Sequence, residues 1–133
     1  RLMQTFLPYP DFRATARVLD ASRLGNQAYN ECRVLINGGW PNHPASKMWQ
    51  GYDSALARYA IELLKELELR SGQYYGDHIA YYNVFIDNDA MPPWLGDERV
   101  HASHRAALLY KRRSWYSQFN WTEEPSLDYY WPV

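Results

Sequence analysis

Apolar residues recur at helical spacing over much of the chain, most clearly between residues 45 and 70. There Leu56, Tyr59 and Leu63 follow one another at intervals of three or four residues, which brings them onto one face of a helix. Ser71-Gly72 interrupts this pattern, and glycine commonly ends helices. We therefore expect one long helix over about residues 45–70.

Shorter segments carry further signals for helix starts and stops. Asp11 follows a proline and can cap a short helix, because its carboxylate can accept hydrogen bonds from the first free backbone N–H groups. A second helix is expected over about residues 22–36, with the glycine pair Gly38-Gly39 as its stop. A third is expected over residues 98–112, and Pro44 suits the first position of a helix.

The remaining segments are interpreted as loops or as less regular structure. Residues 40–44 form a proline-bounded loop, and residues 88–96 form another around Pro92-Pro93. Residues 74–85 are aromatic without a clear period, and the tail after Trp115 is aromatic and interrupted by prolines. No segment alternates as a strand would, so we predict an all-α fold. The length of 133 residues suits one domain over residues 1–133.

Composition excludes several classes of protein. Cys32 is the only cysteine, which rules out an internal disulfide and a cysteine-rich zinc cluster. No apolar run approaches the roughly 20 residues that span a bilayer, so no membrane association is expected. We expect an intracellular monomer, in the cytoplasm with the nucleoid or other DNA, or encoded by a virus. The 12 tyrosines and 6 tryptophans can fill a core, and they can also stack on nucleic acid bases.

The charges are nearly balanced, at 14 basic and 15 acidic residues, but they are segregated along the chain. Up to residue 50 there are six basic and three acidic residues, and residues 99–113 carry five basic residues and no acidic one. Residues 53–98 carry nine acidic and three basic residues. A fold that brings the two basic blocks together would have one basic face. The alternative is that these charges are ordinary solvated helix faces.

The four histidines were considered as metal ligands. His101 and His104 lie three residues apart on a predicted helix and could chelate together. Alternatively, His104 packs against the core and bonds a backbone carbonyl while His101 faces solvent. No acidic or cysteine partner lies at ligand spacing, which favours roles other than metal binding. The sequence also lacks a phosphate-binding glycine loop, a serine nucleophile elbow and a His-Glu-x-x-His helix, so we predict no cofactor.

The second predicted helix contains an isolated acid. Glu31 is the only carboxylate in the run from Arg23 to Arg33, and Gln27 lies four residues before it on the same helical stripe. A carboxylate surrounded by arginines stays ionised and can face a substrate. The alternative is an ordinary ion pair on a helix surface.

Several segments together resemble one enzyme family. The matching segments are Thr5–Tyr9, Val18–Asp20, Arg23–Gln27, Gly39–Ala45, Lys47–Trp49 with Gly51-Tyr52, Pro92–Asp97 and His101–Arg105. In these segments the chain resembles the pyrimidine-dimer DNA glycosylase (endonuclease V) family. Similarity to the phage enzyme of that family rests on the step Tyr29-Asn30-Glu31, on the long helix to Arg70 and on the aromatic residues Trp115-Tyr116.

The resemblance implies a compact all-helical enzyme that binds damaged duplex DNA and cuts an N-glycosidic bond. In this family a free N-terminal α-amine attacks the sugar, an imine forms, and β-elimination nicks the strand. Glu31 would stabilise the cationic sugar and move protons. The family start aligns with Met3, so the reactive amine is expected at Gln4 or Thr5. Because Arg1 and Leu2 extend past that point, activated water is an alternative nucleophile, and Lys47 is the next candidate amine.

The resemblance also implies DNA contacts. From the residue types we expect phosphate contacts from two basic groups, Arg13, Arg17, Arg23 and Arg33 in the first and Arg105, Lys111, Arg112 and Arg113 in the second. Further DNA-binding side chains are expected at Asn26, Gln27, His43, Lys47, His101 and His104. His43 could instead brace its loop. Candidates for base stacking are Trp40, Trp49, Trp115 and Tyr116, although Trp49 and Trp94 suit the core better.

The expected partner is double-stranded DNA with a lesion or a modified base. Three other functions remain open at this point. One is a non-catalytic DNA-binding module on the same scaffold. Another is a glycosylase that removes a different modified base without lyase activity. A metal-dependent phosphodiesterase is the third.

Overall fold

The computed structural model describes residues 4–133; Arg1, Leu2 and Met3, on which the predicted family start falls, lie outside this range. All regular elements of the described residues are helices and none is a strand, which confirms the all-α prediction. The elements are α1 (Phe12–Val18), α2 (Ala21–Asn26), the π-helix η1 (Gln27–Glu31), α3 (Cys32–Ile36), α4 (Pro44–Trp49), α5 (Asp53–Ser71), α6 (Gly76–Asn83), α7 (Glu98–Lys111), α8 (Arg113–Tyr116) and the 3₁₀ turn η2 (Ser117–Phe119).

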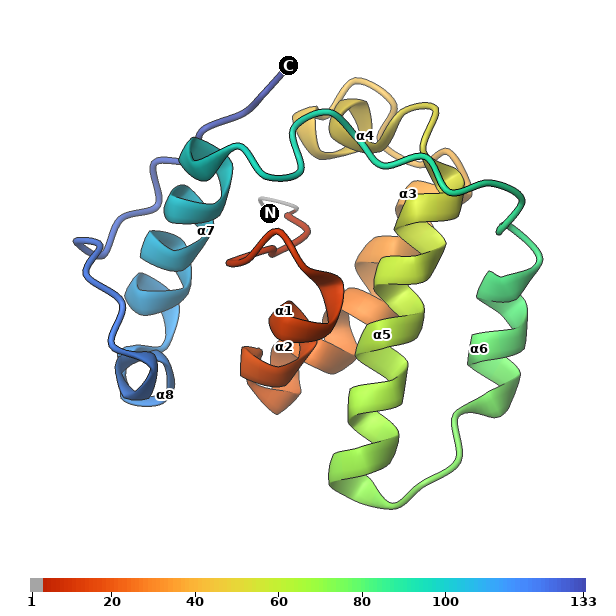
Figure 1. Cartoon of the computed structure of the whole chain (residues 1–133), viewed down its shortest axis with the longest axis horizontal. Helices are drawn as coiled ribbons and strands as arrows, with labels where there is room; N and C mark the ends of the chain where they lie inside the picture. Colours follow the sequence, from red (N-terminus) through yellow and green to blue (C-terminus); the bar gives the residue numbers. More distant parts are fainter. Residues whose placement is uncertain (1–3) are drawn as a thin grey trace.

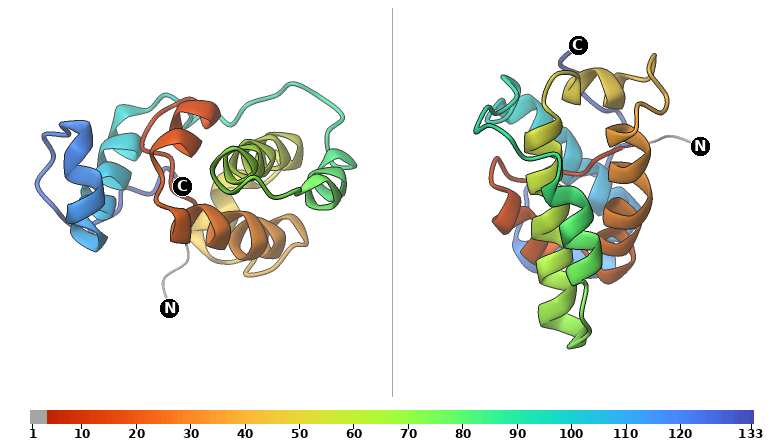
Figure 2. Two further views of the ribbon diagram at one scale, coloured as in Figure 1. Left: turned by 90° about the horizontal axis from the view of Figure 1, so that it is seen from below. Right: turned by 90° about the vertical axis from the view of Figure 1, so that its right-hand side faces the viewer.

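The long helix α5 forms the centre of the arrangement (Figure 1). Helix α6 packs beside α5, and α1 and α2–η1–α3 pack against its other sides. Helices α7 and α8 lie farther from α5, and the N-terminal segment of residues 4–8 runs between α7 and α5 (Figures 1 and 2). The tail after η2 returns along α7, where the Ser126 N–H donates to the Ala106 carbonyl over 3.1 Å.

Most predicted helix ends are confirmed. The Asp11 carboxylate caps α1 by accepting from the Ala14 N–H over 2.7 Å. Pro44 is the first residue of α4, and α7 begins and ends within one residue of its predicted limits. Helix α5 ends at Gly72, whose φ of 72° lies in the left-handed region that glycine adopts at little cost.

The prediction of one helix over residues 45–70 is wrong, because the chain breaks between α4 and α5. Gly51 has a φ of 83°, so it turns the backbone where an L-residue would be strained. The break directs Trp49 inward from the end of α4. Its ring stacks on Tyr59 of α5 at 5.8 Å, and its indole N–H donates to the Thr5 hydroxyl over 2.9 Å.

The second predicted helix is continuous in space but contains one wide turn. Between α2 and α3, residues 27–31 form a π-turn in which the Cys32 N–H bonds the Gln27 carbonyl five residues earlier. Such turns change the direction of side chains and often occur at functional sites. Here the turn buries both Gln27 and Glu31.

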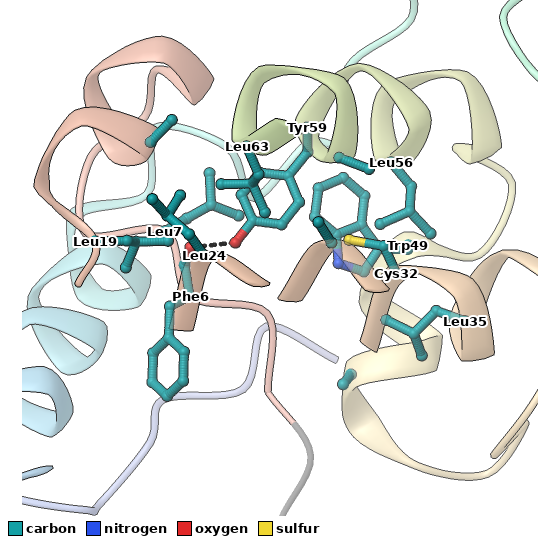
Figure 3. Close-up of a cluster of buried hydrophobic side chains, with 14 of the residues drawn as sticks. Phe6, Leu7, Leu19, Leu24, Cys32, Leu35, Trp49, Leu56, Tyr59 and Leu63 are labelled. Atoms are coloured by element: carbon teal, nitrogen blue, oxygen red, sulfur yellow. Dashed lines mark hydrogen bonds between the residues drawn. The ribbon is translucent and has the colours of Figure 1, made fainter. Parts of the chain in front are cut away.

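The core joins the N-terminal segment to α2, η1, α3 and α5 (Figure 3). Its aromatic members include Trp49 and Trp94, so the prediction that these two fill the core is confirmed. Tyr116, considered above for base stacking, is fully buried and cannot present its ring to DNA. Trp115 is partly buried, with its indole N–H donating to the Val18 carbonyl over 2.8 Å.

Candidate active site

The N-terminal segment is held in the interior by side chains of the surrounding helices. Gln27, from the π-turn, donates through Nε2 to the Gln4 carbonyl over 2.9 Å and accepts from the Phe6 N–H over 3.1 Å. The Tyr59 hydroxyl donates to the Phe6 carbonyl over 2.6 Å (Figure 3). Because these contacts satisfy buried backbone groups, they fix the position of the segment beside η1.

Two histidines of α7 hold the next residue of this segment. His104 Nδ1 accepts from the Leu7 N–H over 2.9 Å, and His101 Nδ1 donates to the Leu7 carbonyl over 2.8 Å. His101 Nε2 accepts in turn from the Gly96 N–H over 2.9 Å. Burial, with smaller contributions from His101 and Arg105, lowers the pKa of His104 to about 3, so its ring is neutral.

These positions correct three interpretations of the pair. Both rings are buried, so neither His101 nor His104 reaches a DNA phosphate. Their Nδ1 atoms are engaged with Leu7, which leaves no pair of nitrogens for chelation. The alternative is also wrong in part, because His101 does not face solvent and His104 accepts from a backbone N–H. Within the described residues, no group of three or more potential ligands could hold a metal ion.

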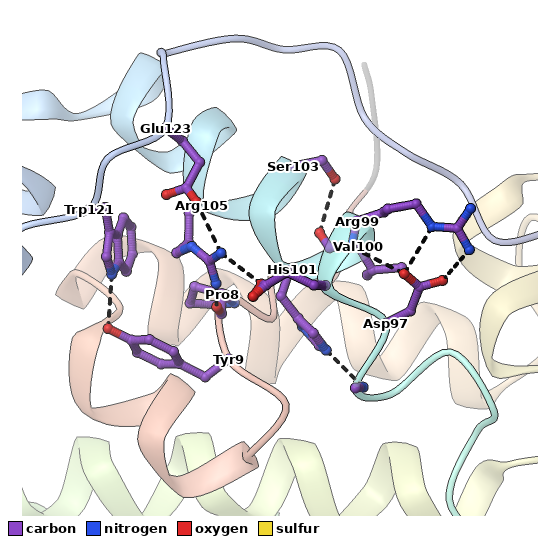
Figure 4. Close-up of polar contacts among 12 residues, drawn as sticks. Pro8, Tyr9, Asp97, Arg99, Val100, His101, Ser103, Arg105, Trp121 and Glu123 are labelled. Atoms are coloured by element: carbon purple, nitrogen blue, oxygen red, sulfur yellow. Dashed lines mark hydrogen bonds and ion pairs between the residues drawn. The ribbon is translucent and has the colours of Figure 1, made fainter.

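Arg105 is likewise occupied inside the protein. It donates to the Pro8 carbonyl over 2.7 Å and forms ion pairs with Glu98 at 2.7 Å and Glu123 at 3.0 Å (Figure 4). Nearby, the Trp121 indole N–H donates to the Tyr9 hydroxyl over 2.9 Å. Arg105 thus connects the N-terminal segment to the C-terminal tail, and the prediction that it binds a phosphate does not fit these contacts.

A cavity of about 390 Å³ opens where the N-terminal segment meets the π-turn. Its lining combines the predicted catalytic acid with amide and cationic side chains: Gln4, Phe6, Ser22, Arg23, Asn26, Gln27, Glu31 and Lys111. Glu31 is only 2 % exposed and Gln4 only 3 %. The structure thus brings together six predicted site residues, Lys111 among them, and it adds Ser22 and Phe6 to the same wall.

A buried carboxylate holds Arg23 of the cavity wall beside a second arginine, Arg112. Asp20 accepts from Arg23 over 3.3 Å and from Arg112 over 3.2 Å, and the Tyr116 hydroxyl also donates to it. Burial alone would raise the pKa of Asp20, but the hydrogen bond from Tyr116 and the two guanidinium groups lower it overall. Arg23 belongs to the first basic block and Arg112 to the second, so the two blocks meet here.

The other predicted phosphate-binding residues do not line the cavity. Arg13 is paired with Glu66 at 3.2 Å, and the Arg33 guanidinium lies over the Tyr81 ring at 3.9 Å. Arg17, Lys47 and Arg113 are exposed and are absent from the cavity lining. Acids pair with several arginines of both blocks, which neutralises part of the basic charge within the protein.

A row of aromatic rings extends from the cavity to the surface. Phe6 lines the cavity and meets Tyr129 at 6.4 Å; Tyr129 meets Trp131 at 5.5 Å. His43 then contacts Trp131 at 5.8 Å and Trp40 at 6.0 Å. Trp40 is 47 % exposed and has a φ of 55°, which is unusual for a tryptophan.

The ring of His43 also has a local structural role within this row. Its Nδ1 accepts from the Ala45 N–H over 3.0 Å and so caps α4, and burial lowers its pKa. The alternative that His43 braces its loop is therefore supported. Sequence reasoning missed Tyr129 and Trp131, for which the only signal was the aromatic composition of the tail.

A larger cavity, of about 510 Å³, lies between α1 and α5 but offers less for chemistry. Its charged side chains are already paired, because Arg13 binds Glu66, Arg58 binds Asp89 and Lys65 lies 3.7 Å from Glu62. The smaller cavity at Glu31 is therefore the better candidate active site.

Comparison with known protein families identifies the family of the chain. The sequence model of the pyrimidine dimer DNA glycosylase family matches residues 3–80. The chain belongs to this family. The family implies a DNA glycosylase with DNA as its substrate. The matched stretch contains Gln4, Gln27 and Glu31 of the cavity but ends before Lys111 and the aromatic tail. No curated protein and no solved structure gave a significant match. None of the helices in residues 4–133 has the length and apolar character needed to cross a bilayer.

Proposed function

We propose that this protein removes a damaged or modified pyrimidine, and a pyrimidine dimer in particular, from double-stranded DNA. The reaction takes place at the cavity beside the π-turn. The observation that carries this proposal is the position of Glu31, a buried carboxylate in the wall of an open cavity whose other lining residues are mostly amides and cations.

Glu31 has the chemistry that cleavage of an N-glycosidic bond requires. As the base leaves, the sugar acquires positive charge at C1′, and a fixed carboxylate beside it offsets that charge. Water is largely excluded around a buried carboxylate, so its attraction for the sugar cation is stronger than at the surface. Glu31 also accepts and returns protons during the reaction.

The remaining cavity residues suit DNA binding. Arg23 in the cavity wall and Arg112 beside it hold phosphates on either side of the lesion, and Asp20 keeps both guanidinium groups in place. The amides of Gln4 and Asn26 face the nucleotide that enters the cavity. A base must leave the helical stack before it can be excised, and exposed Trp40 is the side chain in the aromatic row best able to stack on an unpaired base.

Nicking of the strand would follow if an amine forms an imine with the sugar. Family resemblance assigns this role to an N-terminal α-amine at Gln4 or Thr5. Of these two positions Gln4 is the more suitable, because it lines the cavity, whereas Thr5 is fully buried and bonded to Trp49. With water as the nucleophile, the protein would release the base without nicking.

Base release from defined duplexes tests the proposal. The protein is incubated with duplexes that each carry one pyrimidine lesion, including a cyclobutane dimer, in buffer with excess chelator. Base release is measured as the abasic sugar formed, because the detached base of a dimer stays joined to its neighbour. Release from at least one lesion duplex, with none from undamaged DNA, supports the proposal. Tight binding without any release would instead indicate a DNA-binding module, and strand scission that chelator abolishes would indicate a metal-dependent nuclease.

A further inference from the structure

The chain offers few amines that could attack a sugar. The sequence has three lysines, at positions 47, 65 and 111, and all three lie in the described residues. Lys47 is exposed on α4, and Lys65 is on α5 beside Glu62, at the larger cavity. Lys111 alone lines the cavity that contains Glu31.

The end of α7 fixes the backbone of Lys111 at this position. The helix ends directly after it, because Arg112 leaves the helical conformation with a φ of −151° while its N–H still bonds the Leu108 carbonyl. Leu108 is fully buried, and the Arg112 guanidinium is bonded to Asp20. The attachment point of Lys111 is therefore anchored on both sides, while its side chain is exposed and can turn into the cavity.

The surroundings of Lys111 also favour its neutral, nucleophilic form. Partial burial, and then the positive charge of Arg23, lower the pKa of Lys111. Arg23 is held at the cavity by Asp20, so this repulsion is built into the site. Lysines activated in this way form Schiff bases with carbonyl carbons in other enzymes.

We propose that Lys111 supplies the amine that forms an imine with the deoxyribose of the damaged nucleotide, which gives the protein a lyase activity that does not depend on its N-terminus. This inference rests on the glycosylase function proposed above. Lys111 thus takes the place of Lys47, which does not line the cavity, as the candidate side-chain amine.

The reaction balances without a cofactor. The Nζ lone pair attacks C1′ as the bond between C1′ and the base breaks. The base leaves with the electron pair of that broken bond and takes a proton from water. The attacking nitrogen loses a proton to Glu31. The sugar ring then opens, O4′ takes up a proton, and a protonated imine remains. Loss of a proton from C2′ breaks the C3′–O bond, whose electrons leave with the phosphate. Water finally hydrolyses the imine and restores Lys111.

Borohydride trapping on a duplex with a preformed abasic site tests the proposal separately from base release. The trapped protein is digested, and the modified peptide is identified by mass spectrometry. We expect the adduct on Lys111. We also expect Lys111→Arg, which keeps the charge but not the nucleophile, to lose trapping while its affinity for the abasic duplex stays close to that of the unchanged protein. Lys65→Arg is the matched control and should trap as the unchanged protein does.

Several results would overturn the assignment. They are an adduct on the α-amine or on another lysine, undiminished trapping by folded Lys111→Arg, and base release by a protein that never traps. Failure of the glycosylase proposal looks different: trapping on the abasic duplex would persist, but no lesion duplex would lose its base.

Discussion

His104 does not line the cavity but holds the chain segment that does. Its neutral ring holds the Leu7 N–H in the interior, three residues from the cavity residue Gln4. The folded protein keeps this ring neutral down to a pH of about 3, whereas in the unfolded chain it takes up a proton near pH 6.5. The unfolded state therefore binds more protons between these values, and stability falls as the pH falls.

We predict that His104→Asn flattens the dependence of stability on pH. The asparagine oxygen can still accept from the Leu7 N–H but does not titrate. Between pH 7 and pH 5 the unchanged protein should lose about 2 kcal/mol of unfolding free energy more than the variant does. Urea unfolding at the two pH values measures this difference. An equal loss in both proteins would show that His104 is not the responsible group.

The N-terminal segment and the π-turn form one structural unit through Gln27. This side chain satisfies one backbone carbonyl and one backbone N–H of the segment at once, and it lies in the same turn as Glu31. Loss of its amide would leave both backbone groups buried without their partner, which is more costly than the loss of an exposed hydrogen bond.

Replacement of Gln27 by leucine should therefore destabilise the fold. We expect Gln27→Leu to lower the unfolding free energy by about 2–4 kcal/mol, because two buried backbone groups lose their partner. Chemical denaturation measures the change. Exposed Gln73 is the control, and Gln73→Leu should change stability by less than about 0.5 kcal/mol. Similar effects of the two substitutions would mean that Gln27 does not hold the segment.

Local signals in the sequence located most helix ends but not the two features that shape the site. Asp11, Pro44 and Gly72 act through bonds and φ angles within a few residues, so their effects are visible in the sequence. The break at Gly51 and the π-turn serve long-range packing of Trp49 and of the N-terminal segment. Nothing in helical periodicity encodes such contacts, and both were missed.

At the scale of the whole molecule, the order of charges along the sequence did not predict which charged side chains lie together in the folded protein. Residues 99–113 contain no acid, yet Asp20 and Glu123 reach arginines of this block from distant positions. Glu31 and Gln4 could be selected from the sequence because the family resemblance aligns them. Lys111 was expected only to bind phosphate, since its place beside Glu31 depends on how α7 packs.

The salt dependence of DNA binding should distinguish the arginines at the cavity from those inside the protein. Each phosphate contact contributes about −0.9 to the slope of log K against log salt concentration. We expect Arg23→Gln to make that slope shallower by about 1, as measured by titration of a labelled duplex at several salt concentrations. Arg105→Gln should leave the slope unchanged and lower stability, because its contacts are internal. A shallower slope for Arg105→Gln together with an unchanged slope for Arg23→Gln would place the DNA beside Arg105 instead.

The central claim is that Glu31 performs the chemistry in its cavity, and single-turnover base release by Glu31→Gln tests it most directly. The substitution keeps the shape of the side chain and removes its charge, so release from a lesion duplex should fall by orders of magnitude. Affinity for the duplex should hold or rise, because a negative charge near phosphate is gone. Glu62→Gln, on α5 at the larger cavity, is the control and should release base at the unchanged rate. Near-normal base release by a folded Glu31→Gln protein would contradict the account.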